Sequence, residues 1–380
     1  MKNWRGFSFS RWWAVIAKEF LQLRRDRLSF AMIVGIPLMQ LILFGFAINT
    51  DPKHLPTAVV DLDGSEYTRS IAAAMQRSDY FGVVREAETE ERARELLARG
   101  EAAFVATFPA DFTRRLLRGE RPAMLVEADA TDPSATGPAL SALGQIGRAA
   151  LSKDAKGAMG WREPVADAFE IRVHRLYNPE GISQYNVVPG LMGVILTLMM
   201  VLMTGLAMTR ERERGTMENL LAMPFLPIEV MTGKIVPYVA IGLLQATLIL
   251  GASRALFHVP FEGNLGTLYA VALLFVAANL TVGITLSSLA KNQLQAMQMT
   301  VFYFLPNLLL SGFMFPFYGM PKWAQTIGNL LPLTYFNRLA RGIFLKGSGW
   351  EDLWPNVWPL LAFTAGVMCV ATIFYRKTLD

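Results

Sequence analysis

The chain has only one cysteine and three histidines among its 380 residues. Cys369 therefore has no partner for an intrachain disulfide, and His54, His174 and His258 are too scattered to form a metal cluster. No phosphate-binding loop is present, because isoleucine follows the single Gly-Lys pair at 233–234. No Ser/His/Asp arrangement can be defended either. The sequence thus predicts no catalytic residue, no metal site and no cofactor in this chain.

Charge is also scarce, since 18% of the residues are charged and 53% are hydrophobic. Six apolar runs have the ~20 residues that a ~30 Å hydrocarbon core requires. Their centres contain no Asp, Glu, Lys, Arg or His, whereas ion-coupled transporters usually bind the ion through such a group inside the membrane. We therefore expect the energy source to lie outside the membrane. The runs are Leu28–Asn49, Tyr185–Thr209, Ile235–Ser253, Leu265–Ala290, Leu294–Phe315 and Asn356–Tyr375.

The N-terminal segment 1–27 is basic and is followed by the first span, 28–49. Both are too long for a cleaved signal peptide, which predicts an uncleaved anchor. Within the leader, residues 8–25 place apolar and basic side chains on different helical faces, so we expect an amphipathic helix in the membrane interface. A plain basic leader is the alternative.

Basic residues predict the orientation of the chain. With the N-terminus inside, the cytoplasmic segments carry fourteen Lys and Arg, and the short external loops carry five. By the positive-inside rule both termini are then cytoplasmic, and the long 50–182 segment is external. The net charge of +5 comes from these membrane flanks, which indicates contact with membrane lipids and not nucleic acid.

Residues 50–182 alternate strand and helix patterns, which predicts an extracytoplasmic α/β domain. The expected strands are Ala58–Val60, Phe81–Arg85, Ala102–Thr107, Met124–Glu127 and Phe169–Arg175, and the expected helices are Ser65–Arg77, Thr89–Arg99, Pro109–Leu117 and Pro133–Lys153. Asp61–Ser65 is similar to the start of a calcium loop. Because Ala72 stands where that loop has glutamate, we expect an ordinary Asx turn.

The external segment 313–354 is apolar but is interrupted by proline and glycine. No continuous twenty-residue helix is expected before Asn356. Short re-entrant helices that pack against protein would satisfy the backbone there. Residues 183–380 as a whole are predicted to hold five further transmembrane helices and a cytoplasmic loop at 210–234.

A block of charges directly follows the second apolar run. Gly215 can end the incoming helix, Thr216 can cap a new one, and Pro224 limits that helix to about 217–223. A short polar helix between two spans has the form of a docking element for a soluble protein, although a solvated turn that only fixes topology is the alternative. The candidate docking residues are Glu211, Arg212, Glu213, Arg214, Gly215, Thr216, Met217 and Glu218.

The spans offer neutral polar groups instead of charges. Asn279 lies in the fourth span, and Gln295, Gln298 and Asn307 lie in the fifth. Such amides either form hydrogen bonds between helices, worth ~0.5–2 kcal/mol each, or line a substrate pathway. Both interpretations remain open from the sequence.

The loop at 211–224, with Gly233-Lys234 after it, resembles the first cytoplasmic loop of type-2 ATP-binding-cassette (ABC) transporter permeases. A second stretch is similar to the segment between the fifth and sixth spans of that family. It comprises Leu310-Ser311-Gly312, Phe315-Pro316, Met320–Trp323, Leu331–Phe336 and Arg341-Gly342. An N-terminal span followed by a large external domain resembles the drug-exporter branch.

The resemblance implies the membrane subunit of a bacterial ABC exporter in the inner membrane, with an elbow helix and re-entrant helices. It implies separate ATPase subunits that bind ATP and Mg, a second identical or paralogous permease, and in double-membraned bacteria a periplasmic adaptor protein. Amphiphilic drugs or lipid-like compounds are the expected substrates. The alternatives are an ion-coupled multidrug transporter, and a membrane-anchored sensor or scaffold that acts through residues 50–182.

Overall fold

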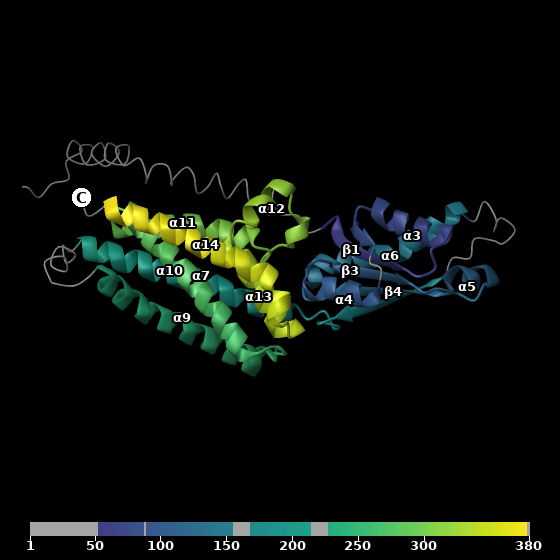
Figure 1. Cartoon of the computed structure of the whole chain (residues 1–380), viewed down its shortest axis with the longest axis horizontal. Coiled ribbons are helices and arrows are strands. Elements are labelled where there is room, and N and C mark those ends of the chain that lie inside the picture. Colours follow the sequence, from purple (N-terminus) through teal and green to yellow (C-terminus); the bar gives the residue numbers. More distant parts are fainter. Residues whose placement is uncertain (1–51, 87–88, 155–167, 214–226, 378–380) are drawn as a thin grey trace, which may run out of the picture.

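The computed structural model describes residues 52–86, 89–154, 168–213 and 227–377. They form two parts that follow each other along the long axis of the molecule (Figure 1). The α/β body comprises residues 55–176, and the helical bundle comprises the described residues from 183 onward. The predicted elbow helix, the first span and the helix expected at 217–223 lie outside the described residues.

The α/β body is built on one five-stranded sheet with the order β2-β1-β3-β4-β5. β1 pairs in parallel with β2 and β3, β3 is antiparallel to β4, and β4 is parallel to β5. All five predicted strands are present, with ends shifted by a few residues. Their bounds are Leu55–Asp61 (β1), Phe81–Glu86 (β2), Phe104–Phe108 (β3), Ala123–Asp129 (β4) and Glu170–Leu176 (β5).

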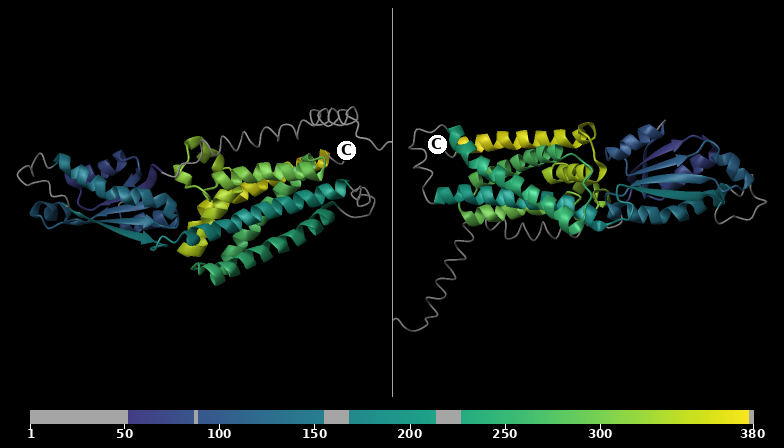
Figure 2. Two further views of the ribbon diagram at one scale, coloured as in Figure 1. Left: turned by 180° about the vertical axis from the view of Figure 1, so that it is seen from behind. Right: turned by 90° about the horizontal axis from the view of Figure 1, so that it is seen from below.

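Helices cover both faces of this sheet (Figure 2). The four predicted helices are present as α3 (Glu66–Arg77), α4 (Glu90–Ala98), α5 (Phe112–Arg118) and α6 (Pro133–Asp154). The apolar sides of α3, α5 and α6 share one core with phenylalanines of β2 and β3, while α4 packs on the opposite face against β1 and β3. Removing these apolar faces from water is what drives the helices onto the sheet.

Local capping explains where α3 begins. The Ser65 hydroxyl accepts the backbone N–H of Thr68, and the Thr68 hydroxyl accepts the N–H of Ser65, which closes a capping box on α3. Just before it, Asp61 Oδ1 accepts the backbone N–H groups of Asp63 and Gly64. This is the expected Asx turn.

The helical bundle contains five long helices, α7 (Ser183–Glu213), α9 (Pro227–Phe257), α10 (Leu265–Leu289), α11 (Gln293–Leu310) and α14 (Trp350–Lys377). Within the described ranges, α7, α9, α10 and α14 are long and apolar enough to cross a membrane. α11 does not qualify, because its 18 residues include three glutamines and one asparagine. At 1.5 Å per residue it is only ~27 Å long. It ends at Leu310 and not, as the sequence suggested, near Phe315.

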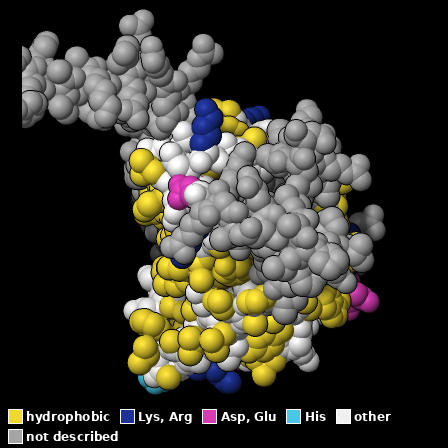
Figure 3. All heavy atoms as spheres, turned by 90° about the vertical axis from the view of Figure 1, so that its left-hand side faces the viewer, with side chains coloured by type: hydrophobic (Ala, Val, Ile, Leu, Met, Phe, Trp, Pro, Cys, Tyr) yellow, Lys and Arg dark blue, Asp and Glu magenta, His cyan; other side chains and the backbone are white. Residues whose placement is uncertain are grey.

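α10 lies at the centre of the bundle and packs against α7, α9, α13 and α14. α9 and α14 instead expose long apolar faces, with Leu244, Leu248 and Leu256 of α9 among the most exposed large side chains. In the end-on view of Figure 3, hydrophobic side chains dominate the lower part of the visible surface. An apolar surface of this extent is suited to lipid.

Short helices fill the interrupted segment between α11 and α14, as expected. They are η2 (Phe317–Gly319), α12 (Lys322–Gly328), α13 (Pro332–Arg341) and the π-helical η3 (Gly342–Lys346). α13 is buried: the ring of Phe336 stacks on Phe275 of α10 at 4.2 Å, and a Cβ on Gly193 of α7 would lie 2.6 Å from side chains of Leu333 and Phe336.

One boundary in this region was predicted wrongly. α14 begins at Trp350 and continues through Pro355 and Pro359, whereas the last apolar run was predicted to begin at Asn356. Pro355 is the sixth residue of α14, beyond the first four N–H groups that lack an intrahelical acceptor, so the helix continues although each proline removes one backbone hydrogen bond. The interrupted segment is therefore shorter than residues 313–354.

Candidate transport and coupling site

The predicted docking residues lie only partly within the described structure. Glu211 and Arg212 belong to the last turn of α7, which ends at Glu213. The exposed Glu213 side chain is described, whereas residues 214–218 are outside the described ranges. Residues 210–213 therefore continue the helix instead of starting a loop at Arg210.

Glu213 connects α7 to the first residue of α11. Its Oε1 accepts the backbone N–H of Gln293 at 2.7 Å, and its Oε2 accepts the Gln293 side-chain amide. These hydrogen bonds hold the pKa of Glu213 below its usual value. A carboxylate at a helix N-terminus is also favoured by the helix dipole. Glu213 thus links the C-terminal end of α7 to the N-terminal end of α11.

Gln295 has a local structural role at the same end of α11. Its Oε1 accepts the backbone N–H of Lys291 at 2.9 Å, and its own backbone N–H bonds to the N-cap side chain of Asn292 at 2.8 Å. The side chain is buried. The structure therefore shows Gln295 closing the turn that starts α11, while a role in the pathway stays a prediction.

The other three candidate pathway amides share an unusual feature. Asn279 and Asn307 are fully buried, and each donates its Nδ2 to a carbonyl one turn earlier in its own helix, that of Phe275 or Tyr303. The amide oxygens of Asn279, Gln298 and Asn307 are buried, and none has a hydrogen-bond partner among the described residues. An unsatisfied buried acceptor costs ~1–3 kcal/mol. The hydrogen bonds recorded for these asparagines do not join helices.

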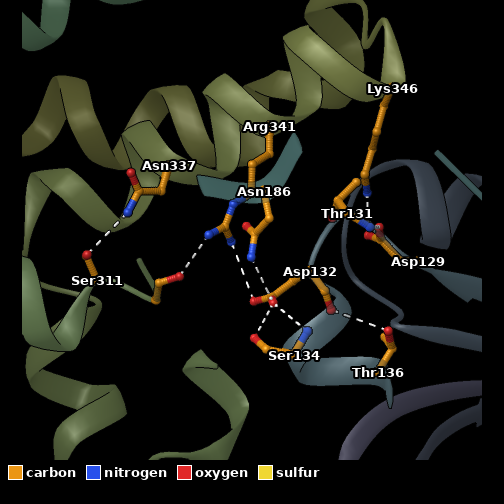
Figure 4. A network of polar contacts seen from close by, with 11 residues as sticks. Asp129, Thr131, Asp132, Ser134, Thr136, Asn186, Ser311, Asn337, Arg341 and Lys346 are labelled. Carbon is orange, nitrogen blue, oxygen red and sulfur yellow. Dashed lines mark hydrogen bonds and ion pairs between the residues drawn. The ribbon is translucent and has the colours of Figure 1, made fainter. Parts of the chain in front are cut away.

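Sequence reasoning missed a polar network between the α/β body and the bundle (Figure 4). We define the interbody network as Asp129 and Asp132 of the body with Asn186, Arg341 and Lys346 of the bundle. Lys346 Nζ donates to Asp129 Oδ2 at 2.6 Å and to the carbonyl of Leu97 at 2.9 Å. Lys346 and Asp129 are only 8% and 14% exposed, so water screens this pair little.

The second half of the interbody network is centred on Asp132. Its Oδ1 accepts the Nδ2 of Asn186, at the start of α7, at 3.1 Å. Its Oδ2 lies 3.8 Å from Arg341, which also donates to the carbonyl of Gly312 at 3.0 Å. Burial lowers the pKa of Arg341, while the two aspartates oppose that shift. α7, α13 and η3 are thereby all fixed to one edge of the α/β body.

Two further contacts extend this interface. Arg99 of the body lies 3.5 Å from Asp352 at the start of α14. The Lys346 ammonium lies 5.0 Å from the ring centroid of Tyr177, whose pKa is raised to about 12 by burial and then by the charge of Asp129. In the sequence, Arg341 and Lys346 were recognised only as two of the five basic residues in the short predicted external loops. Their partners are some 210 positions away, and no local pattern indicates the pairing.

Comparison with known proteins identifies the family of this chain. Residues 27–373 match the ABC-2 family transporter protein family. Similar chains include the probable multidrug ABC transporter permeases YbhR and YbhS of Escherichia coli (strain K12). YbhR is 28% identical over 369 residues, which cover 97% of this chain and 99% of the relative. YbhS is 29% identical over 378 residues, which cover 98% of each.

A more distant relative is ABC transporter G family member 20 of Dictyostelium discoideum. It is 22% identical over 382 residues, which cover 95% of this chain and 50% of that protein. These two bacterial relatives, which match over nearly their full length, are named as permeases, in keeping with the long apolar helices of this chain. The chain belongs to the ABC-2 family of transporter proteins and is a permease subunit of an ABC exporter.

Proposed function

We propose that this permease moves amphiphilic drugs or lipid-like compounds out of the cytoplasm or the inner leaflet, driven by ATP hydrolysis in a separate subunit. The names of YbhR and YbhS refer to multidrug transport, which supports this substrate class. The buried neutral amides of α10 and α11 support it as well, because they suit molecules with little charge. A second permease would complete the pathway, and a periplasmic adaptor could contact the α/β body.

The proposed orientation places the α/β body outside the cell and both termini in the cytoplasm of a bacterial inner-membrane protein. Six spans, an N-terminal elbow helix and re-entrant α12 and α13 belong to the same proposal. The arrangement of the described helices supports it: α7 and α14 both begin at the α/β body, through Asn186 and Asp352, and run to the opposite end of the bundle. The end of α7 at Glu213 and the C-terminal end of α14 therefore both lie far from the body.

The contact between Glu213 and Gln293 is the observation that carries the coupling proposal. An ATPase bound at residues 210–224 would move the end of α7, and Glu213 would pass that movement to α11. α11 holds Gln298 and Asn307, so the same helix links the docking end to the candidate pathway.

Substitution of Glu213 tests this coupling. Glu213→Lys places a cation against the N-terminus of α11 and should remove substrate-stimulated ATP hydrolysis in the assembled transporter, while expression is maintained. Glu213→Asp keeps the charge and should retain part of the stimulation. Glu66→Lys, at an exposed glutamate of α3, is the matched control. Full stimulation in the Glu213→Lys variant would show that the contact does not transmit the movement.

The amides test the pathway proposal separately. Asn307→Leu and Asn279→Leu remove buried oxygens that lack a partner, so a structural role predicts little loss of melting temperature or even a gain. A pathway role predicts an altered set of exported compounds at unchanged protein levels. Resistance profiles and melting temperatures of the same variants separate the two. An unaltered profile contradicts the pathway assignment, whether or not the melting temperature changes.

A further inference from the structure

A cavity of about 290 Å³ lies between the α/β body and α13. The body contributes Asp129 and Asp132 to its wall, α13 contributes Arg338 and Arg341, and the segment after α11 contributes Phe317 and Tyr318. Charged groups and aromatic rings thus line one partly open cavity at the junction of the two parts. The amides of α11 discussed above do not line it.

The acidic groups of the cavity are already well satisfied. Asp129 has Lys346 at 2.6 Å and accepts the backbone N–H of Thr131 at 3.1 Å. Asp132 Oδ1 accepts hydrogen bonds from Asn186, the Ser134 hydroxyl and the Ser134 backbone (Figure 4). A cationic ligand would have to displace these donors, which is unfavourable in a buried site.

The basic groups are not satisfied to the same degree. Arg338 lies over the rings of Phe317 and Tyr335, with its guanidinium carbon 4.7 Å and 5.9 Å from their centroids. Within the described part of the chain, no carboxylate lies within ion-pair distance of Arg338. Arg341 reaches Asp132 only at 3.8 Å, and its buried Nε has no hydrogen-bond partner there.

Arg338 and Arg341 are three positions apart on α13, so they are neighbours on one helical face. Two like charges at this spacing repel each other, and both line the same cavity. An anion between them would relieve the repulsion and supply acceptors for the unused guanidinium donors. Arginine binds phosphate and carboxylate groups well, because its planar donors match their oxygens.

We propose that this cavity binds an anionic group, a phosphate or a carboxylate, on an amphiphile or on a small free anion. Cavities for drug-sized ligands measure ~300–1,000 Å³, so this one fits a head group and not a whole amphiphile. Phe317 and Tyr318 provide an apolar wall next to the charged site. An amphiphile would reach it from the external side, a point that rests on the proposed orientation, whereas binding itself does not depend on transport.

Titration calorimetry on the purified full-length protein tests the proposal. The probes are dihexanoylphosphatidic acid, dihexanoylglycerol (the same chains without phosphate) and inorganic phosphate. We expect phosphatidic acid to bind and dihexanoylglycerol not to bind. Arg338→Gln should weaken that binding by about tenfold or more, as the loss of a charged hydrogen bond predicts. Arg338→Lys should retain part of the affinity, and Arg118→Gln, at an exposed arginine of α5, should retain all of it.

The outcomes separate the possible sources of the anion. Equal affinity for inorganic phosphate and phosphatidic acid supports the anion site with a free anion as its ligand, and tighter binding of phosphatidic acid supports a head group. Absence of binding by both anionic probes overturns the proposal. Equal binding of dihexanoylglycerol, or unchanged affinity in the Arg338→Gln protein, also overturns it. If the assembled transporter does not export compounds with ATP but the protein still binds the anionic probes, the proposed function is refuted and the anion site is not.

Discussion

Replacing Lys346 with methionine removes the cation that joins η3 to the α/β body. The change leaves Asp129, which is only 14% exposed, without its charged partner in a nearly water-free contact. It also leaves the carbonyl of Leu97 without the ammonium donor. The methionine side chain can occupy most of the volume of the lysine stem, so the expected loss is electrostatic.

Breaking a buried ion pair by removing one partner costs ~3–5 kcal/mol. Because both groups retain slight solvent contact, we expect the lower end of this range, about 3 kcal/mol. With a shift of about 2 °C per kcal/mol for a chain of this size, the melting temperature should fall by about 6 °C. Thermal unfolding of the purified protein in detergent measures this shift. Lys322→Met, at an exposed lysine of α12, is the control and should change little.

The double variant Lys346→Met/Asp129→Asn decides whether the pair itself is responsible. Removing both charges eliminates the unpaired carboxylate, so the double variant should be more stable than the sum of the two single losses predicts. Strict additivity, or equal melting temperatures of the Lys346→Met and Lys322→Met proteins, would refute the assignment of Lys346 as a link between the two parts.

Two further predictions concern local packing and acid stability. Although burial alone would raise its pKa, hydrogen bonds from Thr113 and Ser65 keep the pKa of Asp63 below its usual value of 3.8. The ionised Asp63 carboxylate therefore stabilises the fold above that value, and this stabilisation is lost as the pH falls through the lowered pKa. Asp63→Asn should lower the melting temperature at pH 6 and make the melting temperature fall less steeply in acid. Gly193→Ala should destabilise the protein by ~1–3 kcal/mol, because the new Cβ would lie 2.6 Å from two α13 side chains, whereas Gly251→Ala on α9, with open space around it, should not. The first prediction is checked by melting temperatures of the Asp63→Asn and unsubstituted proteins at several pH values. The second is checked by melting temperatures of the two glycine variants at neutral pH.

The secondary structure of the α/β body could be predicted from the sequence because its signals are local. Strand patterns such as that of β1, and the capping residues Ser65 and Thr89, indicate elements within a few positions of themselves. The long apolar runs indicate the spanning helices for the same reason. The start of α14 could not be predicted in this way, because tertiary packing sustains a helix through Pro355.

The interbody network was not predictable from local patterns. Lys346 and Asp129 are more than 200 positions apart, and each taken alone is an ordinary charge in a loop or at a strand end. The available signal was the presence of basic residues in the otherwise apolar segment 313–354, where a charge needs a partner. The pathway amides were chosen for their residue type. Their unpaired oxygens were visible only once the neighbouring helices were in place.

Transport by everted membrane vesicles from cells that produce this chain together with its ATPase tests the central claim most directly. A fluorescent amphiphilic dye should accumulate inside the vesicles when ATP is added, because the cytoplasmic face is then outward. The accumulation should persist when a protonophore removes the proton gradient, since the apolar centres of the spans hold no charged group for ion coupling. It should be absent with a non-hydrolysable ATP analogue. Accumulation that requires a proton gradient and proceeds without ATP would contradict the account.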